Sequence, residues 1–342
     1  LAIEEDLVEE IARIHGYDKL PAPPPPELTG KRPAASVGES RTRLARRALA
    51  SAGYLEAVTW SFCDSKHALL FGFGPNQITA MKIVNPISSD LDCMRPTALP
   101  NLLRAAQKNL DRGYGDARLF EAGPAYGETE QKRTVVGVWQ PRAQRFWQGA
   151  ENPDLFSVKQ DCLRALDAMG APIGSLQAAP PIDPWWHPGR AGVLKLGNKA
   201  VAAFGEIHPG VLEKLDVEGP ALAFEIWIDA LPAPRAKPTR AKPALEKSDL
   251  MPLSRDFAFV VDDKVAAADL VRAALGADKA LISDVNLFDL YRGPGVPDGK
   301  KSLAIEVRVQ PKEKTLAEEE IAALSAKIVS AVMKATGGTL RA

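Results

Sequence analysis

The stretch from Phe288 to Gln310 constrains the fold of this chain more than any other, because it joins two strand-like runs through a short loop. After the loop, apolar residues occupy every second position from Leu303 to Val309. A period of two is typical of a strand that buries one face. Before the loop, the run from Leu281 to Leu290 is also β-rich. Glycines and prolines exclude regular structure between the runs, and flanking cations suggest a platform for an anionic ligand.

The surrounding segments predict a complete small domain in which helices and strands follow the order βαββαβ. This order is that of a split, ferredoxin-like sandwich. In the second helix, Thr315 and Glu318 have the spacing of a capping box. The elements around the two central strands are a strand over Ser254–Asp263, helices over Val265–Leu275 and Thr315–Thr336, and a last short strand at Thr339–Leu340.

Five sequence motifs of this region, in their order along the chain, resemble those of a known family. They are RDFAFVVD, FDLYRG, KKSLAIEVRVQ, TLAEEEI and the closing LR. Together they resemble the terminal anticodon-binding domain of the bacterial phenylalanyl-tRNA synthetase β subunit. The resemblance implies a ferredoxin-like anticodon-binding domain over residues 248–342.

The region between residues 39 and 231 mixes helices and strands without regular βαβ alternation, which predicts an α+β domain with a largely antiparallel sheet. The segment NPISSDLDCMRPTALPNLL resembles the interface-forming first motif of class II synthetases, and RLFEAGPAY resembles the strand of the second. The predicted helices are Ser40–Ala52, Pro100–Asp111 and Leu155–Met169, and the predicted strands are Ala57–Phe62, Met81–Val84 and residues 118–126, 135–139, 191–196, 200–207 and 221–228.

This class II-like core is predicted to be inactive, with no catalytic residue. Adenylate formation needs arginines that hold the ATP phosphates, and the last predicted strand of the core has none. Arg95 and Arg118 are interpreted as structural or interface residues. No phosphate-binding or nucleophile motif is present, and the four histidines have no ligand spacing.

The first segment, residues 1–20, reads as a helix that ends at Gly16, the end of a small preceding domain. Its acids Asp6, Glu9 and Glu10 share one helix face, where they could hold Mg²⁺ or form a solvated acidic surface. The segment DLVEEIARI followed by GYD resembles the same family, which implies a Mg²⁺ shared with the α subunit and one further ligand upstream. Because the chain starts at Leu1 without an initiator Met, we expect it to be cut from something longer.

Two segments rich in proline are interpreted as linkers, residues 21–38 and residues 232–247. The cations of the second linker could contact phosphates or be solvated.

Composition fits a globular chain and no more: hydrophobic residues make up 46% and charged residues 25%. The 43 basic and 43 acidic residues cancel, so affinity for RNA must come from a local patch. The three cysteines are far apart, which favours a reducing, cytoplasmic location. No apolar run is long enough for a membrane span.

Tyr291 is the candidate for stacking on an unpaired base, with a packed tyrosine as the alternative. By resemblance, Ala258 and Ser302 also line the anticodon surface, through close backbone approach and a hydroxyl hydrogen bond. The phosphate candidates, each of which could instead be a solvated charge, are Arg255, Arg292, Lys300 and Lys301.

The resemblance implies a non-catalytic part of a phenylalanine–tRNA ligase. The α subunit of an α₂β₂ heterotetramer would use ATP and Mg²⁺, and this chain would scaffold it and bind tRNA(Phe). Two alternatives stay open from the residues alone: an autonomous class II-type ligase, and an amino-acid-binding regulatory module, since fold alone does not settle function.

Overall fold

The computed structural model describes residues 3–24, 35–142, 147, 153–234, 247–312 and 314–341. The first element is α1 (Glu4–His15), which ends at Gly16 as predicted. A short 3₁₀ turn, η1 (Tyr17–Lys19), follows it. Gly16 has φ 102°, a left-handed conformation that glycine adopts readily, so the helix ends there. No residue of α1 is buried.

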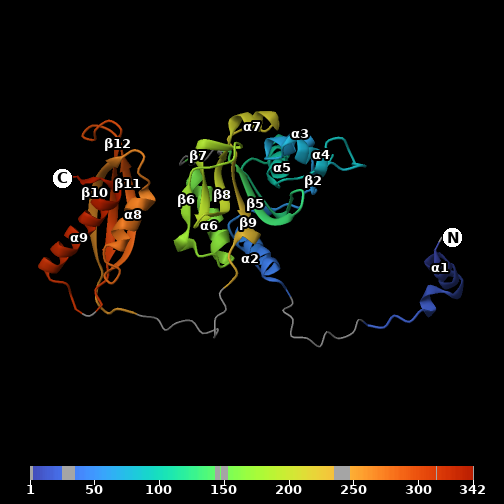
Figure 1. The fold of residues 1–342 in the computed structure, drawn as a ribbon, viewed down its shortest axis with the longest axis horizontal. Coiled ribbons are helices and arrows are strands. Elements are labelled where there is room, and N and C mark those ends of the chain that lie inside the picture. Colours follow the sequence, from blue (N-terminus) through green and yellow to red (C-terminus); the bar gives the residue numbers. More distant parts are fainter. Residues whose placement is uncertain are drawn as a thin grey trace.

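The largest unit is built on a seven-stranded sheet with the order β1-β4-β5-β9-β8-β7-β6 (Figure 1). All neighbouring strands are antiparallel except β1 and β4, which are parallel. The predicted α+β class with a largely antiparallel sheet is therefore confirmed. The strands are β1 (Leu55–Glu56), β4 (Ala117–Tyr126), β5 (Gln131–Gln140), β6 (Gln177–Ala179), β7 (Trp186–Leu196), β8 (Lys199–Ile207) and β9 (Leu222–Trp227).

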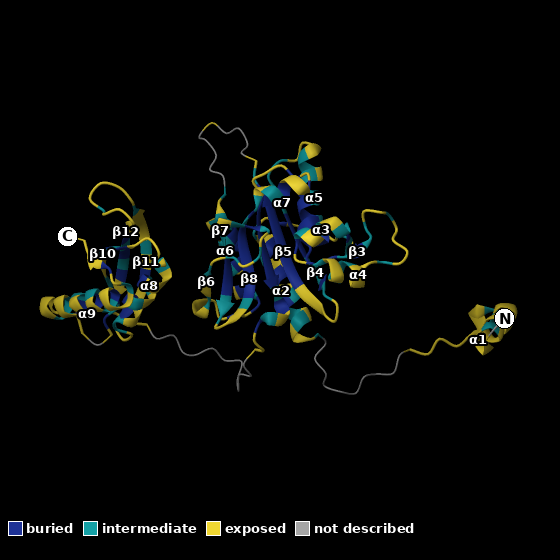
Figure 2. Cartoon of the chain, turned by 45° about the horizontal axis from the view of Figure 1, so that its top comes forward, coloured by how far each residue is buried: buried dark blue, intermediate teal, exposed yellow. Residues whose placement is uncertain are grey.

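Helices cover both faces of this sheet, so its central strands are buried (Figure 2). One core joins α2 (Val37–Ser51) and α6 (Leu155–Ala168) to residues such as Phe224 and Ile226. The other core joins α5 (Leu99–Asp111) and α7 (Pro209–Lys214) to residues such as Val136 and Ala223. Short 3₁₀ turns, η2 (Ile173–Ser175) and η3 (Ile228–Ala230), follow α6 and β9.

The segment between α2 and α5 differs most from the prediction. Residues 57–62 form no continuous strand; only β2 (Phe62–Cys63) pairs with β3 (Cys93–Met94). The strand predicted over Met81–Val84 is wrong, because α4 (Pro75–Met81) occupies its start after the short α3 (Ser65–Leu70). Asp64 caps α3 through the Lys66 N–H, and Pro75 stands in the first turn of α4, where a missing N–H costs nothing.

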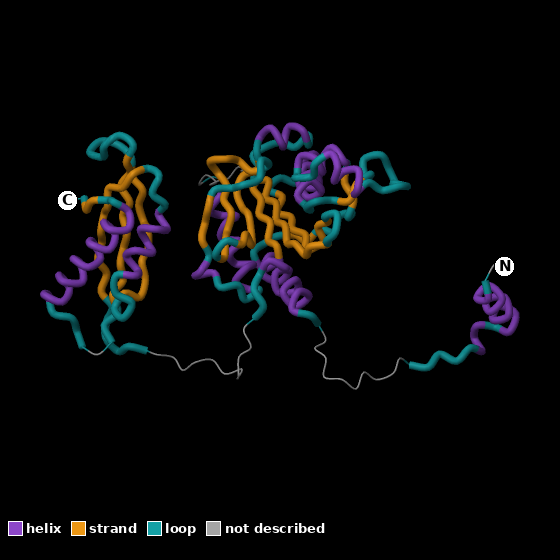
Figure 3. Tube along the Cα trace, in the orientation of Figure 1, coloured by secondary structure: helices purple, strands orange, loops and turns teal. Residues whose placement is uncertain are grey.

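The last unit has the predicted order βαββαβ and the sheet order β11-β12-β10-β13, entirely antiparallel. Figure 3 shows its strands side by side with the helices against them. Both helices pack on one face of the sheet in a single core with Phe259, Leu303 and Ile305. The ferredoxin-like class is therefore confirmed. The elements are β10 (Leu253–Asp262), α8 (Ala267–Gly276), β11 (Ile282–Tyr291), β12 (Lys300–Val309), α9 (Glu318–Thr336) and β13 (Thr339–Leu340).

Two predicted element starts are corrected. The last long helix begins at Glu318, not Thr315, because the Glu320 carboxylate accepts from the Ala317 N–H and fixes the first turn there. Helix α2 begins at Val37, inside the predicted linker, because Ser36 and Glu39 form a capping box. Most of the predicted linkers, at 25–34 and 235–246, lies outside the described residues, so the domain boundaries stay predictions.

Candidate nucleic-acid interface

The ferredoxin-like sheet has one face covered by α8 and α9 and one face without helices, which we call the open face. Successive side chains of β12 point to opposite faces of the sheet, so the residue number decides which of them reach the open face. Leu303, Ile305, Val307 and Val309 point into the helix-covered core, so the alternate positions, including Ser302, belong to the open face. Tyr291 lies opposite Ser302 in the register, and Ala258 lies opposite Ala304. The structure thus brings Tyr291, Ser302 and Ala258 onto one surface.

Tyr291 is half-buried at the end of β11 and is held by the loop that follows it. Its hydroxyl donates to the Pro294 carbonyl at 3.2 Å. A side chain at Gly293 would come within 2.8 Å of that hydroxyl, so the tight approach requires glycine, which also has φ 156°. The ring therefore has a fixed position and is not enclosed in the core.

Arg341 was not predicted as a site residue, yet its guanidinium lies over the Tyr291 ring, 5.3 Å from the ring centroid. The backbone N–H of Arg341 donates to Ala258 O at 2.7 Å, which extends the pairing of β13 with β10 and brings the side chain across the open face. Ser302 is only 3% exposed. Tyr291 thus contacts Arg341 and lies beside Ser302 in the register, and we call these three residues the Tyr291 cluster.

The four predicted phosphate contacts do not share a surface. Lys300 is on the open face by register, opposite Asp262, and is exposed. Arg292 is exposed and pairs with Asp263 at 3.1 Å. The prediction for Lys301 must be corrected. Its side chain points to the same side of the sheet as Leu303 and Ile305, is 8% exposed and donates to the Asp263 carbonyl at 2.8 Å.

Arg255 must be corrected as well. It lies opposite Val307 and so takes the helix-covered side of the sheet, although it is exposed. The open face also carries acids, among them Asp289, which lies opposite Ala304. Its cations are Lys300 and Arg341, at the end of the sheet that carries Tyr291, and Arg308, at the opposite end of β12.

The three acids of α1 do not make a metal site by themselves. The Glu10 carboxylate pairs with Arg13 at 2.5 Å, and Asp6 accepts from the Ile3 N–H at 3.3 Å. Within the described part of the chain, no group of three or more His, Cys, Asp or Glu side chains is placed to hold a metal ion. Asp6, Glu9 and Glu10 could contribute to a Mg²⁺ site only together with ligands from elsewhere.

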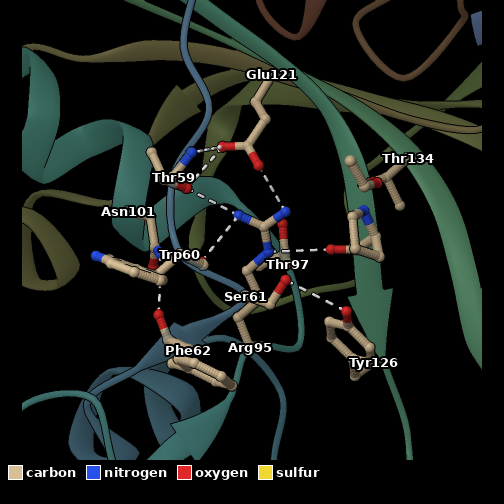
Figure 4. A network of polar contacts seen from close by, with 12 residues as sticks. Thr59, Trp60, Ser61, Phe62, Arg95, Thr97, Asn101, Glu121, Tyr126 and Thr134 are labelled. Atoms are coloured by element: carbon tan, nitrogen blue, oxygen red, sulfur yellow. Dashed lines mark hydrogen bonds and ion pairs between the residues drawn. The ribbon is translucent and has the colours of Figure 1, made fainter. Parts of the chain in front are cut away.

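In the larger unit, Arg95 is fully buried and its guanidinium is used entirely in internal contacts (Figure 4). It pairs with Glu121 Oε1 at 2.7 Å and donates to Thr59 Oγ1 at 2.8 Å and to the Pro124 carbonyl at 3.0 Å. A side chain at Gly123 would come within 2.7 Å of the guanidinium, so the second-motif strand needs glycine there. Arg118, the other candidate, stacks on Trp139 at 3.5 Å.

A second buried acid, Glu225, lies on the same face of the sheet, two strands away from Glu121. Burial raises the pKa of Glu225 to about 7, and nearby Asp183 adds to the rise, while a hydrogen bond from Thr97 and the charge of Arg95 oppose it. Neither Arg95 nor Arg118, the two arginines of the motif-like segments, is free to bind a triphosphate.

We expect Glu225→Gln to change the pH dependence of folding. Between about pH 4.5 and 7 the unfolded chain releases this proton and the folded chain keeps it, so the wild-type free energy of unfolding falls as pH rises. The variant lacks that loss and should be more stable than wild type at pH 8 by on the order of 1 kcal/mol, with no gain at pH 4.5. Urea unfolding at both pH values measures it, with Glu213→Gln on α7 as control; an equal gain at both would contradict the assignment.

Comparison with known proteins follows the same division into two units. Residues 24–228 match the family described as "Phenylalanyl tRNA synthetase beta chain CLM domain". The chain belongs to the phenylalanyl-tRNA synthetase beta chain family. Residues 248–341 match the "Ferredoxin-fold anticodon binding domain".

The relatives of this beta chain include curated proteins named "Phenylalanine--tRNA ligase beta subunit". That of Paramagnetospirillum magneticum is 52% identical over 346 aligned positions, covering 100% of this chain and 43% of the relative. That of Bradyrhizobium diazoefficiens is 49% identical, covering 98% of this chain and 43% of the relative. The chain thus spans less than half the length of these relatives.

Among solved structures, a pyrrolysyl-tRNA synthetase from Desulfitobacterium hafniense has a TM-score of 0.44 and 16% identity, covering 66% of this chain and 74% of that chain. Within the described residues of the beta chain, none of the helices is both long and apolar enough to cross a bilayer.

Proposed function

We propose that this beta chain is a non-catalytic part of a phenylalanine–tRNA ligase and that its ferredoxin-like unit binds the anticodon region of tRNA(Phe) through the Tyr291 cluster. The observation that carries the proposal is the meeting of Tyr291, Ser302 and Arg341 on the open face. An aromatic ring on a sheet face, with cations beside it, is how single-stranded RNA is held.

Tyr291 and Arg341 of the Tyr291 cluster, together with three charged side chains outside it, have separate parts in this proposal. Tyr291 stacks on an unpaired base, and its hydroxyl bond to Pro294 holds the ring ready. Arg341 places a cation beside that nucleotide, and the Asp289 carboxylate offers an acceptor for base N–H groups. Lys300 and Arg292 face the phosphates. Because the whole chain is neutral, these few cations have to supply the electrostatic attraction.

We infer that the larger unit scaffolds a catalytic α subunit, within an α₂β₂ assembly, and does no chemistry of its own. Arg95 and Arg118 are engaged inside the protein, so neither is free to hold a triphosphate. Several apolar side chains near the first motif are instead exposed: Val58 by 85%, Trp60 by 60% and Ile87 by 71%. Val58 and Trp60 line one cavity, and exposed apolar side chains close together are typical of a surface that a partner covers. ATP and Mg²⁺ would be used by that partner.

The proposal is tested by co-purifying the chain with a cognate α subunit and assaying transfer of phenylalanine to tRNA(Phe). We expect aminoacylation only when both are present. Calorimetry of the chain alone with an anticodon stem-loop, and separately with free phenylalanine, tests the RNA contact. ATP consumption without a partner would favour an autonomous ligase, and tight binding of phenylalanine without RNA binding would favour a regulatory module.

Lys300 and Lys301 are a matched pair that tests the proposed face. Lys300→Ala should weaken binding of the stem-loop and reduce the slope of log K against log salt by about 0.7 to 1, because one phosphate contact is lost. Lys301→Met should leave that slope unchanged, because its ammonium is bound to the Asp263 carbonyl. Filter binding at several salt concentrations measures both. Equal loss of slope in the two variants would contradict the assignment of faces.

A further inference from the structure

A cavity of about 500 Å³ lies on the face of the seven-stranded sheet that carries Glu225 and is lined by residues of β7, β8 and β9. Its floor includes Val193 and Ala203, which are opposite each other on neighbouring strands. Trp186, which is 2% exposed, and Trp227 also line it. The size is that of a site for a small molecule, and the mixture of apolar surface with a few polar groups is usual for one.

Asp183 is the group in this cavity that the fold leaves without a partner. It is half-buried, and it forms no hydrogen bond or ion pair through its side chain within the ranges that the structure describes. Burial raises the pKa of its carboxyl, since no cation nearby offsets the desolvation. A second buried acid, Glu225, lies close enough for the two carboxyls to interact unfavourably. A half-buried carboxylate in a cleft, destabilised in this way, is a candidate for binding a positive group.

Four of the other charges around the cavity are already paired within the fold. Glu130 pairs with Lys132 at 2.6 Å, and Asp229 pairs with Arg133 at 3.1 Å. Lys199 is exposed at the start of β8 and does not contribute to the shift of Asp183. Two charges in the lining thus have no ion pair among the described residues, the exposed Lys199 and the half-buried Asp183, and Asp183 is the one that burial destabilises. Indole faces attract ammonium groups, most strongly where water is excluded.

We propose that this cavity is a binding site for a small organic ammonium ion, a primary amine with a compact apolar body. The ammonium pairs with the Asp183 carboxylate, and the apolar body packs on Trp186, Trp227, Val193 and Ala203. The site is separate from the Tyr291 cluster and does not depend on the proposed RNA contact. It also needs none of the arginines that the class II reaction requires.

The test uses the complete chain and two probes of nearly equal shape, phenethylamine and its neutral counterpart 2-phenylethanol. We expect calorimetry to show phenethylamine binding at least about tenfold tighter than the alcohol, a difference of about 1.4 kcal/mol. In NMR spectra the indole N–H signals of Trp186 and Trp227 should shift with phenethylamine, and that of Trp60 should not. Equal binding of the two probes, or no binding of the amine at about 10 mM, would overturn the proposal.

Variants locate the binding. Asp183→Asn keeps the shape of the side chain and should weaken phenethylamine binding at least about tenfold, whereas Asp167→Asn, an exposed acid on α6, should not change it. If Asp183→Asn lowers the melting temperature strongly, Ala200→Leu tests the site instead. It narrows the cavity without removing a charge, so it should weaken phenethylamine binding. Unchanged affinity for phenethylamine in a folded Asp183→Asn variant, or in Ala200→Leu, would contradict the proposal.

Discussion

Arg95→Ala should lower the free energy of unfolding of the larger unit by about 3 to 5 kcal/mol, the usual cost of leaving one partner of a buried ion pair uncompensated. The guanidinium is fully buried, and Glu121 is 4% exposed. Loss of the Arg95 guanidinium leaves the Glu121 carboxylate without its cation. It also leaves the Thr59 hydroxyl and the Pro124 carbonyl without the donor that Arg95 provides. For a unit of this size the melting temperature should fall by roughly 6 to 20 °C, measurable by calorimetry.

Two further variants separate this effect from loss of any surface charge. Arg190→Ala removes a cation from another Arg–Glu pair, in which Arg190 is 51% exposed, and should cost less than about 1 kcal/mol. In the double variant Arg95→Met/Glu121→Met, the loss should be smaller than the sum of the single losses, because no charge is left buried. If Arg95→Ala cost as little as Arg190→Ala, the network in Figure 4 would not hold the unit together.

The Arg95 network also connects stability with the proposed partner surface. The Arg95 guanidinium donates a hydrogen bond to the Trp60 carbonyl at 3.3 Å. The same carbonyl also accepts from the Asn101 amide at 2.8 Å. Trp60 in turn stacks on Phe62 with ring centroids 6.3 Å apart. The buried Arg95 thus fixes the position of a loop that exposes the Trp60 indole. The arginine of the motif-like segment therefore has a structural role and does not need to bind phosphate.

Long periodic segments could be predicted from the sequence because local chemistry alone determines them. The strand over β12 follows from apolar residues at every second position, and α5 and α6 follow from apolar stripes with clear ends. The segment with α3 and α4 could not, because its helices are only 6 and 7 residues long and their starts depend on single side chains, Asp64 for α3 and Gln77, which accepts from the Gly74 N–H, for α4. In such short helices, periodicity gives little signal.

The candidate site was predictable in part. Tyr291 and Ser302 follow from the motifs, and the parity of the core positions in β12 already implies that Lys301 points the other way. Arg341 could not be placed, because it reaches the open face only through the two-residue strand β13, whose pairing with β10 is long-range. Contacts that depend on such pairing are decided by the assembled fold and not by local pattern.

Tyr291→Ala should weaken binding of the tRNA(Phe) anticodon stem-loop by about fivefold to a hundredfold, since stacking of one base on an aromatic side chain contributes roughly 1 to 3 kcal/mol. The ring is half-buried on the face without helices, so its removal opens no cavity in the core of Phe259 and Leu303. The melting temperature should therefore stay within a few degrees of wild type. Fluorescence anisotropy with a labelled stem-loop at fixed salt concentration measures the affinity.

Tyr291→Phe separates the ring from its hydroxyl. It keeps the stacking surface and the contact with Arg341 but loses the bond to the Pro294 carbonyl, so it should reduce affinity far less than Tyr291→Ala. Tyr114→Ala is the matched control, because Tyr114 is 67% exposed in the larger unit, away from the ferredoxin-like sheet. If Tyr291→Ala bound the stem-loop as tightly as Tyr114→Ala, the ring would have no part in RNA binding, and the open face would have to act through its cations alone.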